Sequence, residues 1–201
     1  MVLSVVERPE ASSEAELVAA CIAGDAAAQR RLCLREYDRI NAIIYRIVGS
    51  TRDADDLVQE TLIAVFRGLP KFRGESKLST WIDRIAVRVV FAHIRARKAT
   101  PASLDVIGDV DGGGGTVDGR AHAREGLRRL YAALAELAPE ARIAFSLYAI
   151  DGRTIPEVAA VIGTSVVTAK LRIWRARRRL LARVAEDPVL GEFVRDAEVR
   201  R

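Results

Sequence analysis

The sequence predicts an all-α protein made of two small helical domains joined by a flexible linker. Apolar residues recur at spacings of three and four along most of the chain, as they do on one face of an α-helix. Half of the 201 residues are hydrophobic, which is enough to bury a core. Between residues 99 and 125 the periodicity stops, and a stretch with six glycines, four aspartates and no Lys or Arg from residue 100 to 119 indicates an acidic linker.

The N-terminal domain is predicted over residues 14–98, after a flexible N-terminus at residues 1–13. Its first helix starts near Glu14, and its second runs from residue 26 to about Gly49, where a glycine ends it. The third helix starts after Thr51 with acidic residues in its first turn, which complement the helix dipole, and Pro70 stops it. A loop at residues 71–79 then leads to a fourth helix at residues 80–98, which has one apolar and one cationic side.

The C-terminal domain is predicted over residues 126–184 as four helices. A charged tail at residues 185–201 follows the break at Asp187-Pro188, and a short extra helix and a disordered end are both open for it. The last two helices resemble a helix-turn-helix. Thr154 and Glu157 have the spacing of a capping box, Gly163 can end the first helix, and Ser165 can cap the second. The turn between them is therefore about three residues long, as the motif requires.

The second helix of this motif has an apolar face and a cationic face. Between Ser165 and Arg183 there are seven basic residues and no acidic one. A helix that is apolar behind and cationic in front suits the major groove of DNA. The simpler alternative is a solvated Arg-rich face on an ordinary helical hairpin. Capping, turn length and the separation of the faces favour DNA binding.

The sequence offers no catalytic or metal-binding constellation. Cys21 and Cys33 have neither a nearby His nor a zinc-ligand spacing, and the linker glycines lack the Lys-Ser/Thr of a phosphate-binding loop. The fragment starting at Asp109 is not a calcium loop, because Arg120 stands where a bidentate Glu is needed. We therefore expect no enzymatic activity, metal, cofactor or small-molecule substrate.

No run of 18 apolar residues occurs, so we expect a cytoplasmic protein without membrane insertion. The net charge of +5 is unevenly distributed. The third helix opens acidic, which disfavours nucleic acid there. The next loop and helix are cationic and include Phe72 and Trp81, and this combination suits single-stranded DNA. Core packing is the expected role for most of the Trp81 ring, whereas Phe72 on its loop is expected to be available.

Two blocks of residues then carry a resemblance to a known family. DADDLVQE at 53–60, FRGES at 72–76, TWI at 80–82 and RIA at 84–86 resemble region 2 of the extracytoplasmic-function sigma factors of bacterial RNA polymerase. LAPEAR at 137–142 and TAKLRIWRAR at 168–177 resemble region 4. Both blocks occur in the family's order with a linker between them, so the resemblance covers residues 14–184.

The resemblance implies partners and residues for each part. Core RNA polymerase would bind the acidic helix through Asp53, Asp56, Gln59 and Glu60. Single-stranded minus-10 promoter DNA would contact Lys71, Phe72, Arg73, Ser76, Lys77, Thr80, Trp81, Arg84 and Arg88. Duplex minus-35 DNA would contact Ser165, Thr168, Lys170, Leu171, Arg172, Arg175 and Arg179. The linker would follow the path of the transcript, and an anti-sigma factor is implied as a further partner.

The chain departs from the family pattern at Val87-Arg88, where Arg-Asn is frequent, and at Ala92, Leu171 and Trp174. The last two stand in the recognition helix and are expected to change the promoter sequence that is read. Two other functions remain open at this point. One is a stand-alone helix-turn-helix regulator, for which the acidic helix has no use. The other is a protein that docks on polymerase and only sequesters it.

Overall fold

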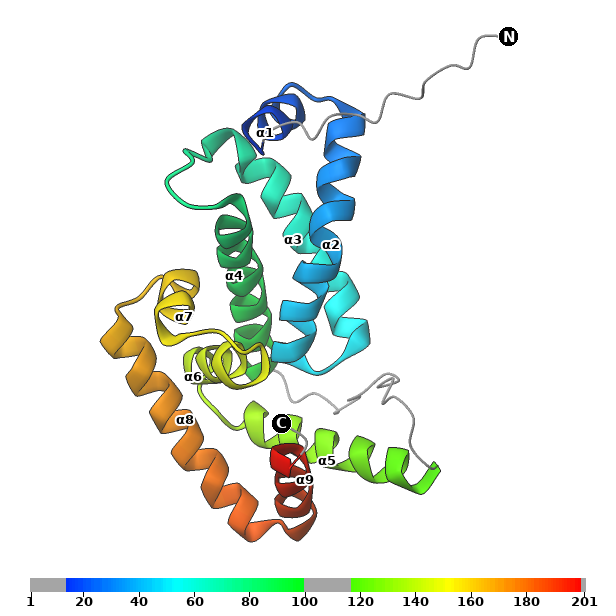
Figure 1. Ribbon diagram of the computed structural model, residues 1–201, viewed down its shortest axis with the longest axis vertical. Coiled ribbons are helices and arrows are strands. Elements are labelled where there is room, and N and C mark those ends of the chain that lie inside the picture. The colour runs from blue at the N-terminus through cyan, green and yellow to red at the C-terminus, as the bar shows by residue number, and fades with distance from the viewer. Residues whose placement is uncertain (1–13, 100–116, 200–201) are drawn as a thin grey trace.

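The computed structural model describes residues 14–99 and 117–199, and these residues form helices without any β-strand. The N-terminal domain contains α1 (Glu14–Ile22), α2 (Ala26–Val48), α3 (Thr51–Gly68), the 3₁₀ turn η1 (Leu69–Lys71) and α4 (Leu78–Ala99). The C-terminal domain contains α5 (Val117–Ala135), α6 (Pro139–Phe145), the π-helical turn η2 (Ser146–Ile150), α7 (Ile155–Ile162), α8 (Val166–Glu186) and α9 (Pro188–Val199). Figure 1 shows this arrangement, which confirms the all-α class.

Short polar side chains and glycines set the helix ends. Asp25 caps α2 by accepting from the backbone N–H groups of residues 27 and 28. Gly49 ends α2 in the left-handed conformation, with φ of 72°, and Ser50 caps α3 at once. Because the connection contains only these two residues, α2 and α3 must pack side by side in opposite directions.

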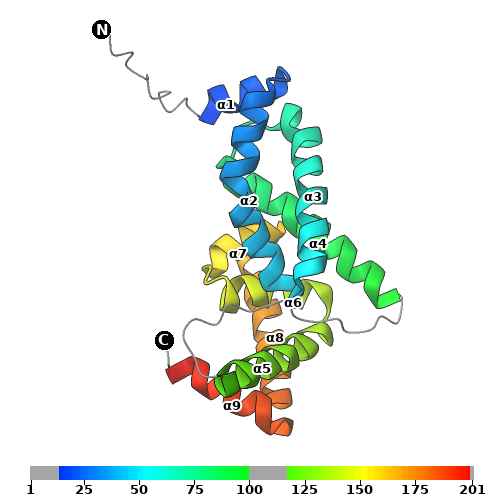
Figure 2. The same cartoon turned by 90° about the vertical axis from the view of Figure 1, so that its right-hand side faces the viewer.

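The core of the N-terminal domain lies between α2, α3 and α4, which contact one another in every pair. Ile40, Ile44, Val58, Ile82 and Val90 are fully buried there. Helix α1 lies across one end of α2, as Figure 2 shows. The side of α3 that faces away from this core stays exposed.

The two domains dock directly against each other. Helix α4 contacts α6 and α7, and α2 contacts η2. One apolar cluster contains residues from both domains, including Ile85 and Val87 of α4 and Val158 and Val161 of α7. The periodicity of the sequence had suggested two domains on a tether and gave no sign of this contact.

The structure corrects one expected boundary and decides one open alternative. Helix α5 already begins at Val117, inside the stretch expected to be linker up to residue 125. The tail after Pro188, for which a short helix and a disordered end were both open, forms the helix α9, and Leu190 is 2% exposed against α5 and α8. The expected flexible N-terminus and residues 100–116 of the linker lie outside the described residues.

Candidate nucleic-acid interface

The helix-turn-helix forms with the predicted caps. The N–H and the hydroxyl of Thr154 both donate to Oε2 of Glu157, at 2.8 and 2.7 Å, which completes the capping box at the start of α7. Gly163 ends α7 with φ of 67°. The N–H of Thr168 donates to Oγ of Ser165 at 3.1 Å and fixes the first turn of α8. These contacts set the angle at which α8 leaves α7.

Helix α8 buries one face and exposes the other. Ala169, Ile173, Ala176 and Leu180 are buried, as the apolar stripe predicts, but Val166 at the start of that stripe is 49% exposed. It differs because it is the first residue of α8 and directly follows the exposed turn that contains Gly163 and Ser165. The opposite face exposes Lys170, Leu171, Arg175 and Arg179, while Arg172 is half-buried.

Trp174 also lies on the exposed side of α8, and 55% of it is accessible. The guanidinium of Arg178 stands 5.6 Å from the centre of its ring, a cation–π contact. Arg172, Arg175 and Arg179 line one side of an open pocket of about 300 Å³, and Glu140 with Ala141 of α6 lines the other. The arginine row therefore borders a groove between α8 and α6.

The residues expected to bind single-stranded DNA surround η1 and the start of α4. Lys71, Arg73 and Lys77 are exposed, and Ser76, Thr80 and Trp81 are half-buried. Phe72 is also half-buried, which corrects the expectation that its ring is free. Its ring packs against that of Trp81, with centroids 5.2 Å apart and planes tilted by 52°. The aromatic pair therefore belongs to the same short segment as three exposed cations.

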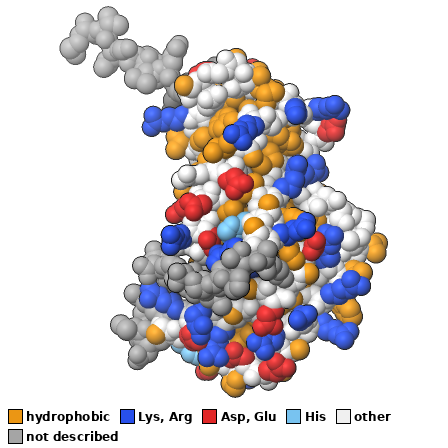
Figure 3. Space-filling model, turned by 180° about the vertical axis from the view of Figure 1, so that it is seen from behind, with side chains coloured by type: hydrophobic (Ala, Val, Ile, Leu, Met, Phe, Trp, Pro, Cys, Tyr) orange, Lys and Arg blue, Asp and Glu red, His pale blue; other side chains and the backbone are white. Residues whose placement is uncertain are grey.

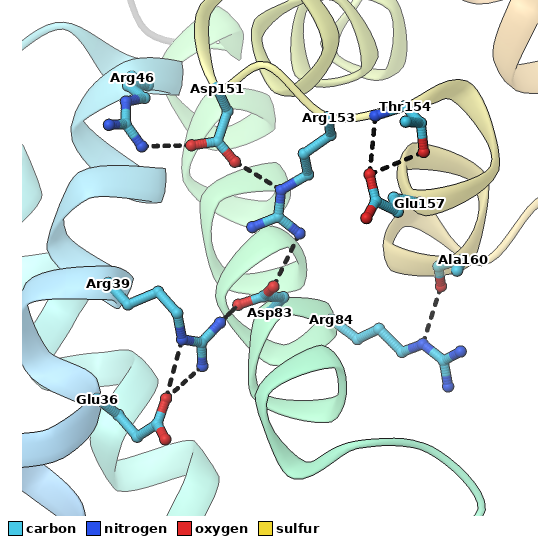
Figure 4. Close-up of polar contacts among 10 residues, drawn as sticks. All are labelled: Glu36, Arg39, Arg46, Asp83, Arg84, Asp151, Arg153, Thr154, Glu157 and Ala160. Carbon is cyan, nitrogen blue, oxygen red and sulfur yellow. Dashed lines mark hydrogen bonds and ion pairs between the residues drawn. The ribbon is translucent and has the colours of Figure 1, made fainter.

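Of the two α4 arginines expected to bind DNA, Arg84 points toward the C-terminal domain (Figure 4). Nε of Arg84 donates to the backbone carbonyl of Ala160 in α7 at 2.9 Å. Nε of Arg88 donates to the carbonyl of Arg84 at 3.2 Å, and the Arg88 side chain is exposed. Part of the cationic face of α4 is thus engaged by the helix-turn-helix.

The acidic residues of α3 divide into a buried edge and an exposed row. Asp53 is half-buried and forms an ion pair with Arg97 of α4. Asp56, Gln59 and Glu60 are exposed. Ile63 is 52% exposed one turn further along this row, and neighbouring α2 exposes Leu34 and Tyr37. Figure 3 shows apolar side chains gathered on this face of the N-terminal domain.

A network of ion pairs joins the domains, and sequence reasoning missed it. Asp83 of α4 accepts from Arg39 of α2 and, at 2.8 Å, from Arg153 of the C-terminal domain. Asp151 binds the same Arg153 and also Arg46 of α2. Burial opposes the charge on Arg153, but the two carboxylates raise its pKa overall. Figure 4 shows this alternating row of charges.

The C-terminal domain also caps the last turn of α2. The four final carbonyls of a helix have no partner within it. Arg142 of α6 donates to the carbonyls of Ile47 and Val48 at 3.0 and 3.2 Å, and the hydroxyl of Tyr131 lies 3.3 and 3.4 Å from those of Arg46 and Tyr45. Burial lowers the pKa of Arg142 to about 10, so the guanidinium stays charged at neutral pH.

Within residues 14–99 and 117–199 no helix is long and apolar enough to cross a membrane. In the same residues no group of three or more His, Cys, Asp and Glu side chains is arranged to hold a metal ion.

A helix-turn-helix with a cationic recognition helix, docked on a second helical domain that presents cations and aromatic rings, defines a DNA-binding protein of the transcription machinery. The family model for sigma-70 region 2 matches residues 32–100, and that for sigma-70 region 4 matches residues 127–180. RNA polymerase sigma-H factor of Pseudomonas aeruginosa is 30% identical over 183 residues, which cover 87% of this chain and 92% of that protein. The chain belongs to the sigma-70 family, in its extracytoplasmic-function (ECF) group.

Further relatives agree with this assignment. The ECF RNA polymerase sigma-E factor of Escherichia coli K12 is 32% identical over 78% of this chain and 86% of its own length. Among solved structures, CnrH in complex with the cytosolic domain of CnrY matches with a TM-score of 0.61 and 27% identity, over 86% of this chain and 97% of that one. The sigma factor RpoE in complex with the anti-sigma factor NepR from Bartonella quintana, at 24% identity and a TM-score of 0.56, supports the fold alone.

The protein is therefore a sigma factor. Its family consists of transcription regulators rather than enzymes. The match over residues 32–100 gives the acidic helix α3 a place in a family domain, which a stand-alone helix-turn-helix regulator would lack.

Proposed function

We propose that the exposed row of α3 is the surface that binds core RNA polymerase. Asp56, Gln59 and Glu60 supply charge and hydrogen-bond acceptors, and Ile63 supplies apolar area beside them. A merely solvated acidic helix needs no exposed apolar neighbours, whereas a protein interface combines an apolar centre with a polar rim. This combination of charge and apolar area is the observation that carries the proposal. Asp53 stands at the edge, because Arg97 already neutralises it.

The proposed contact with melted minus-10 DNA is centred on the Phe72–Trp81 pair. Lys71, Arg73 and Lys77 are exposed around the two rings, so phosphates and a stacked base can be held together. Ser76 and Thr80 add hydroxyls, and Arg88 extends the cationic surface along α4. Arg84 joins this surface only when it releases the carbonyl of Ala160.

The proposed contact with duplex minus-35 DNA is the exposed face of α8. Ser165 and Thr168 lie at its N-terminal end, where backbone N–H groups suit a phosphate. Lys170, Leu171, Arg172 and Arg175 follow along the face that would enter the major groove. Arg179 is one turn further and suits a flanking phosphate. Leu171, 42% exposed, offers an apolar surface that suits the methyl group of thymine.

Three further roles complete the proposal. The protein acts in the cytoplasm, has no catalytic activity of its own, and is regulated by an anti-sigma factor. The last role is supported by CnrH, which has the same fold and was solved with another protein, the cytosolic domain of CnrY, bound to it. By the same proposal, residues 14–98 and 126–184 act as the polymerase-binding and minus-35-binding units, residues 99–125 connect them, and residues 185–201 close the second unit.

A charge reversal on α3 tests the polymerase contact. Asp56→Arg should lower the affinity for core polymerase by about tenfold or more, because like charge at an interface is strongly unfavourable. Glu75→Arg makes the same charge change on an exposed loop of the same domain and should leave polymerase affinity unchanged. Binding is measured by gel filtration and titration, and run-off transcription from the protein's own upstream region reports function. Equal loss in both variants would show that total charge, not α3, controls association.

A further inference from the structure

The C-terminal helix α9 lies beyond residues 127–180, the part matched by the region 4 family model. It is nevertheless packed tightly. Leu190 is 2% exposed, and Phe193 and Val194 pack against the second apolar cluster. The ring of Phe193 lies directly over Gly126 of α5, where an added Cβ would come within 2.4 Å of it. Helix α5 therefore has a glycine at the point where α9 approaches most closely.

A polar contact joins the start of α9 to α5. Asp187 caps α9 by accepting from the N–H of Leu190 at 3.1 Å. The same carboxylate accepts from Nη1 of Arg129 at 2.9 and 2.8 Å, and Arg129 also binds Glu125 at 2.6 Å. The hydrogen bonds from Arg129 lower the pKa of Asp187, so this carboxylate is charged at neutral pH. The contact fixes the angle between the two helices.

Helix α5 depends on α9 for most of its packing inside the C-terminal domain. Its contacts with α9 are far more extensive than those with α8, the other helix of the domain that it touches appreciably. Yet α5 carries Tyr131, whose buried ring covers Gly49 and whose hydroxyl faces the last carbonyls of α2. Helix α9 can therefore influence the N-terminal domain through α5, which carries the Tyr131 contact.

We propose that α9 strengthens the docking of the two domains by holding the Tyr131 contact in place. With α9 in place, α5 is held where Tyr131 caps α2, and the chain stays closed with Arg84 bound to α7. When α9 leaves α5, Tyr131 loses its support, and docking then rests on the remaining contacts, including those of α4 with α6 and α7 and of α2 with η2. The equilibrium shifts toward separated domains, in which Arg84 no longer binds the carbonyl of Ala160 and is free to contact DNA. This inference goes beyond the proposed function and does not depend on it, because docking is a property of the free chain.

The distance between the domains tests this control directly. Spin labels are placed on Glu75→Cys of the N-terminal loop and Arg177→Cys of α8, both exposed, after Cys21 and Cys33 are changed to Ala. Pulsed EPR of the full chain then gives the populations of short and long distances. Phe193→Ala should lower the ratio of docked to separated molecules by about tenfold, because the half-buried ring packs over Gly126 and its truncation removes much of the packing that holds α9.

A second variant separates docking from helix stability. Gly126→Ala favours helix in α5 by its propensity, yet its Cβ displaces Phe193 and should also open the chain. Arg195→Ala, an exposed substitution on α9, is the matched control and should remain closed. Circular dichroism checks that helix content is kept.

Opening in both variants with retained helix content supports the inference. It is overturned if Gly126→Ala keeps the short distance, or if both variants lose helix well beyond the share of α9, since α9 would then only be part of the fold. The affinity of the Arg195→Ala control for core polymerase tests the proposed function separately. The docking inference and the proposed function can therefore fail independently of each other.

Discussion

The close approach of Tyr131 to Gly49 gives a quantitative test of domain docking. An added Cβ at Gly49 would lie 2.3 Å from the Tyr131 ring, and the residue has φ of 72°. Gly49→Ala therefore costs free energy in two ways. The left-handed conformation costs an alanine about 1–2 kcal/mol. The collision with a packed ring adds about 1–3 kcal/mol, because the ring has to move out of its site.

Only the second cost depends on the C-terminal domain. In a Tyr131→Ala background the collision disappears, so Gly49→Ala should then cost only about 1–2 kcal/mol. The coupling between the two substitutions is expected to be at least about 1 kcal/mol. Tyr131→Ala alone should destabilise the protein by about 3–5 kcal/mol, because the ring is 5% exposed and packed against both domains.

Urea unfolding of the four proteins measures this cycle. Circular dichroism follows all helices, while Trp81 and Trp174 report on the N-terminal and C-terminal domains separately. Coincident transitions allow a single free energy to be assigned to each variant. If Gly49→Ala costs the same with and without the Tyr131 ring, within about 0.5 kcal/mol, the two residues do not contact each other in solution and the docked arrangement is wrong.

Three further predictions use the same structure. Arg142→Met leaves the carbonyls of Ile47 and Val48 unpaired and should reduce the free energy of unfolding by about 2–4 kcal/mol in urea titrations; a loss below about 1 kcal/mol would mean that water caps α2. Burial, with Arg97 and Arg142 nearby and opposed by Asp53 and Glu60, lowers the pKa of His93, so the unfolded chain takes up this proton at higher pH than the folded chain. Stability should therefore fall as the pH drops below about 6.5, and His93→Gln should flatten that part of the pH profile; an unchanged slope would exclude His93 as its source. Arg175→Ala should weaken binding to the cognate minus-35 duplex by about 1–3 kcal/mol in fluorescence anisotropy, and equal weakening on unrelated DNA would make it a phosphate contact.

Much of the fold is predictable from the sequence because local chemistry decides it. Gly49, Gly163 and Ser165 end or start helices through their own backbone and side-chain bonds, so they act in the same way wherever the helices pack. The start of α5 at Val117 was hidden because Gly119 and Asp118 resemble linker residues. The sequence left open whether residues after Pro188 form a helix. The apolar side chains of α9 pack against α5 at Gly126, and this contact between distant segments is not visible in the sequence.

Docking of the domains was unpredictable for a different reason. Asp83 and Val87 lie beside the apolar stripe of α4, and Val161 lies beside that of α7. The periodicity of each helix alone therefore predicts that these three positions are exposed. They are buried because the other domain covers them. Hydrophobic periodicity shows which face of a helix is buried, but it does not show which other helix covers that face. The buried Arg142 was equally unpredictable, because it stands three residues after Pro139 in α6, where a cation is ordinarily exposed.

The chemistry of the docked surface favours reversible association over permanent packing. Buried ion pairs such as Asp83 with Arg153 gain little net free energy, because removing both charges from water costs about as much as their attraction returns. Arg142 has the same property, since its lowered pKa shows that burial disfavours its charge. These groups therefore specify how the domains fit, while the apolar contacts of α4 with α7 supply the attraction. A surface built in this way can separate when a partner with greater affinity for either domain binds, and the charged groups then return to water at little cost.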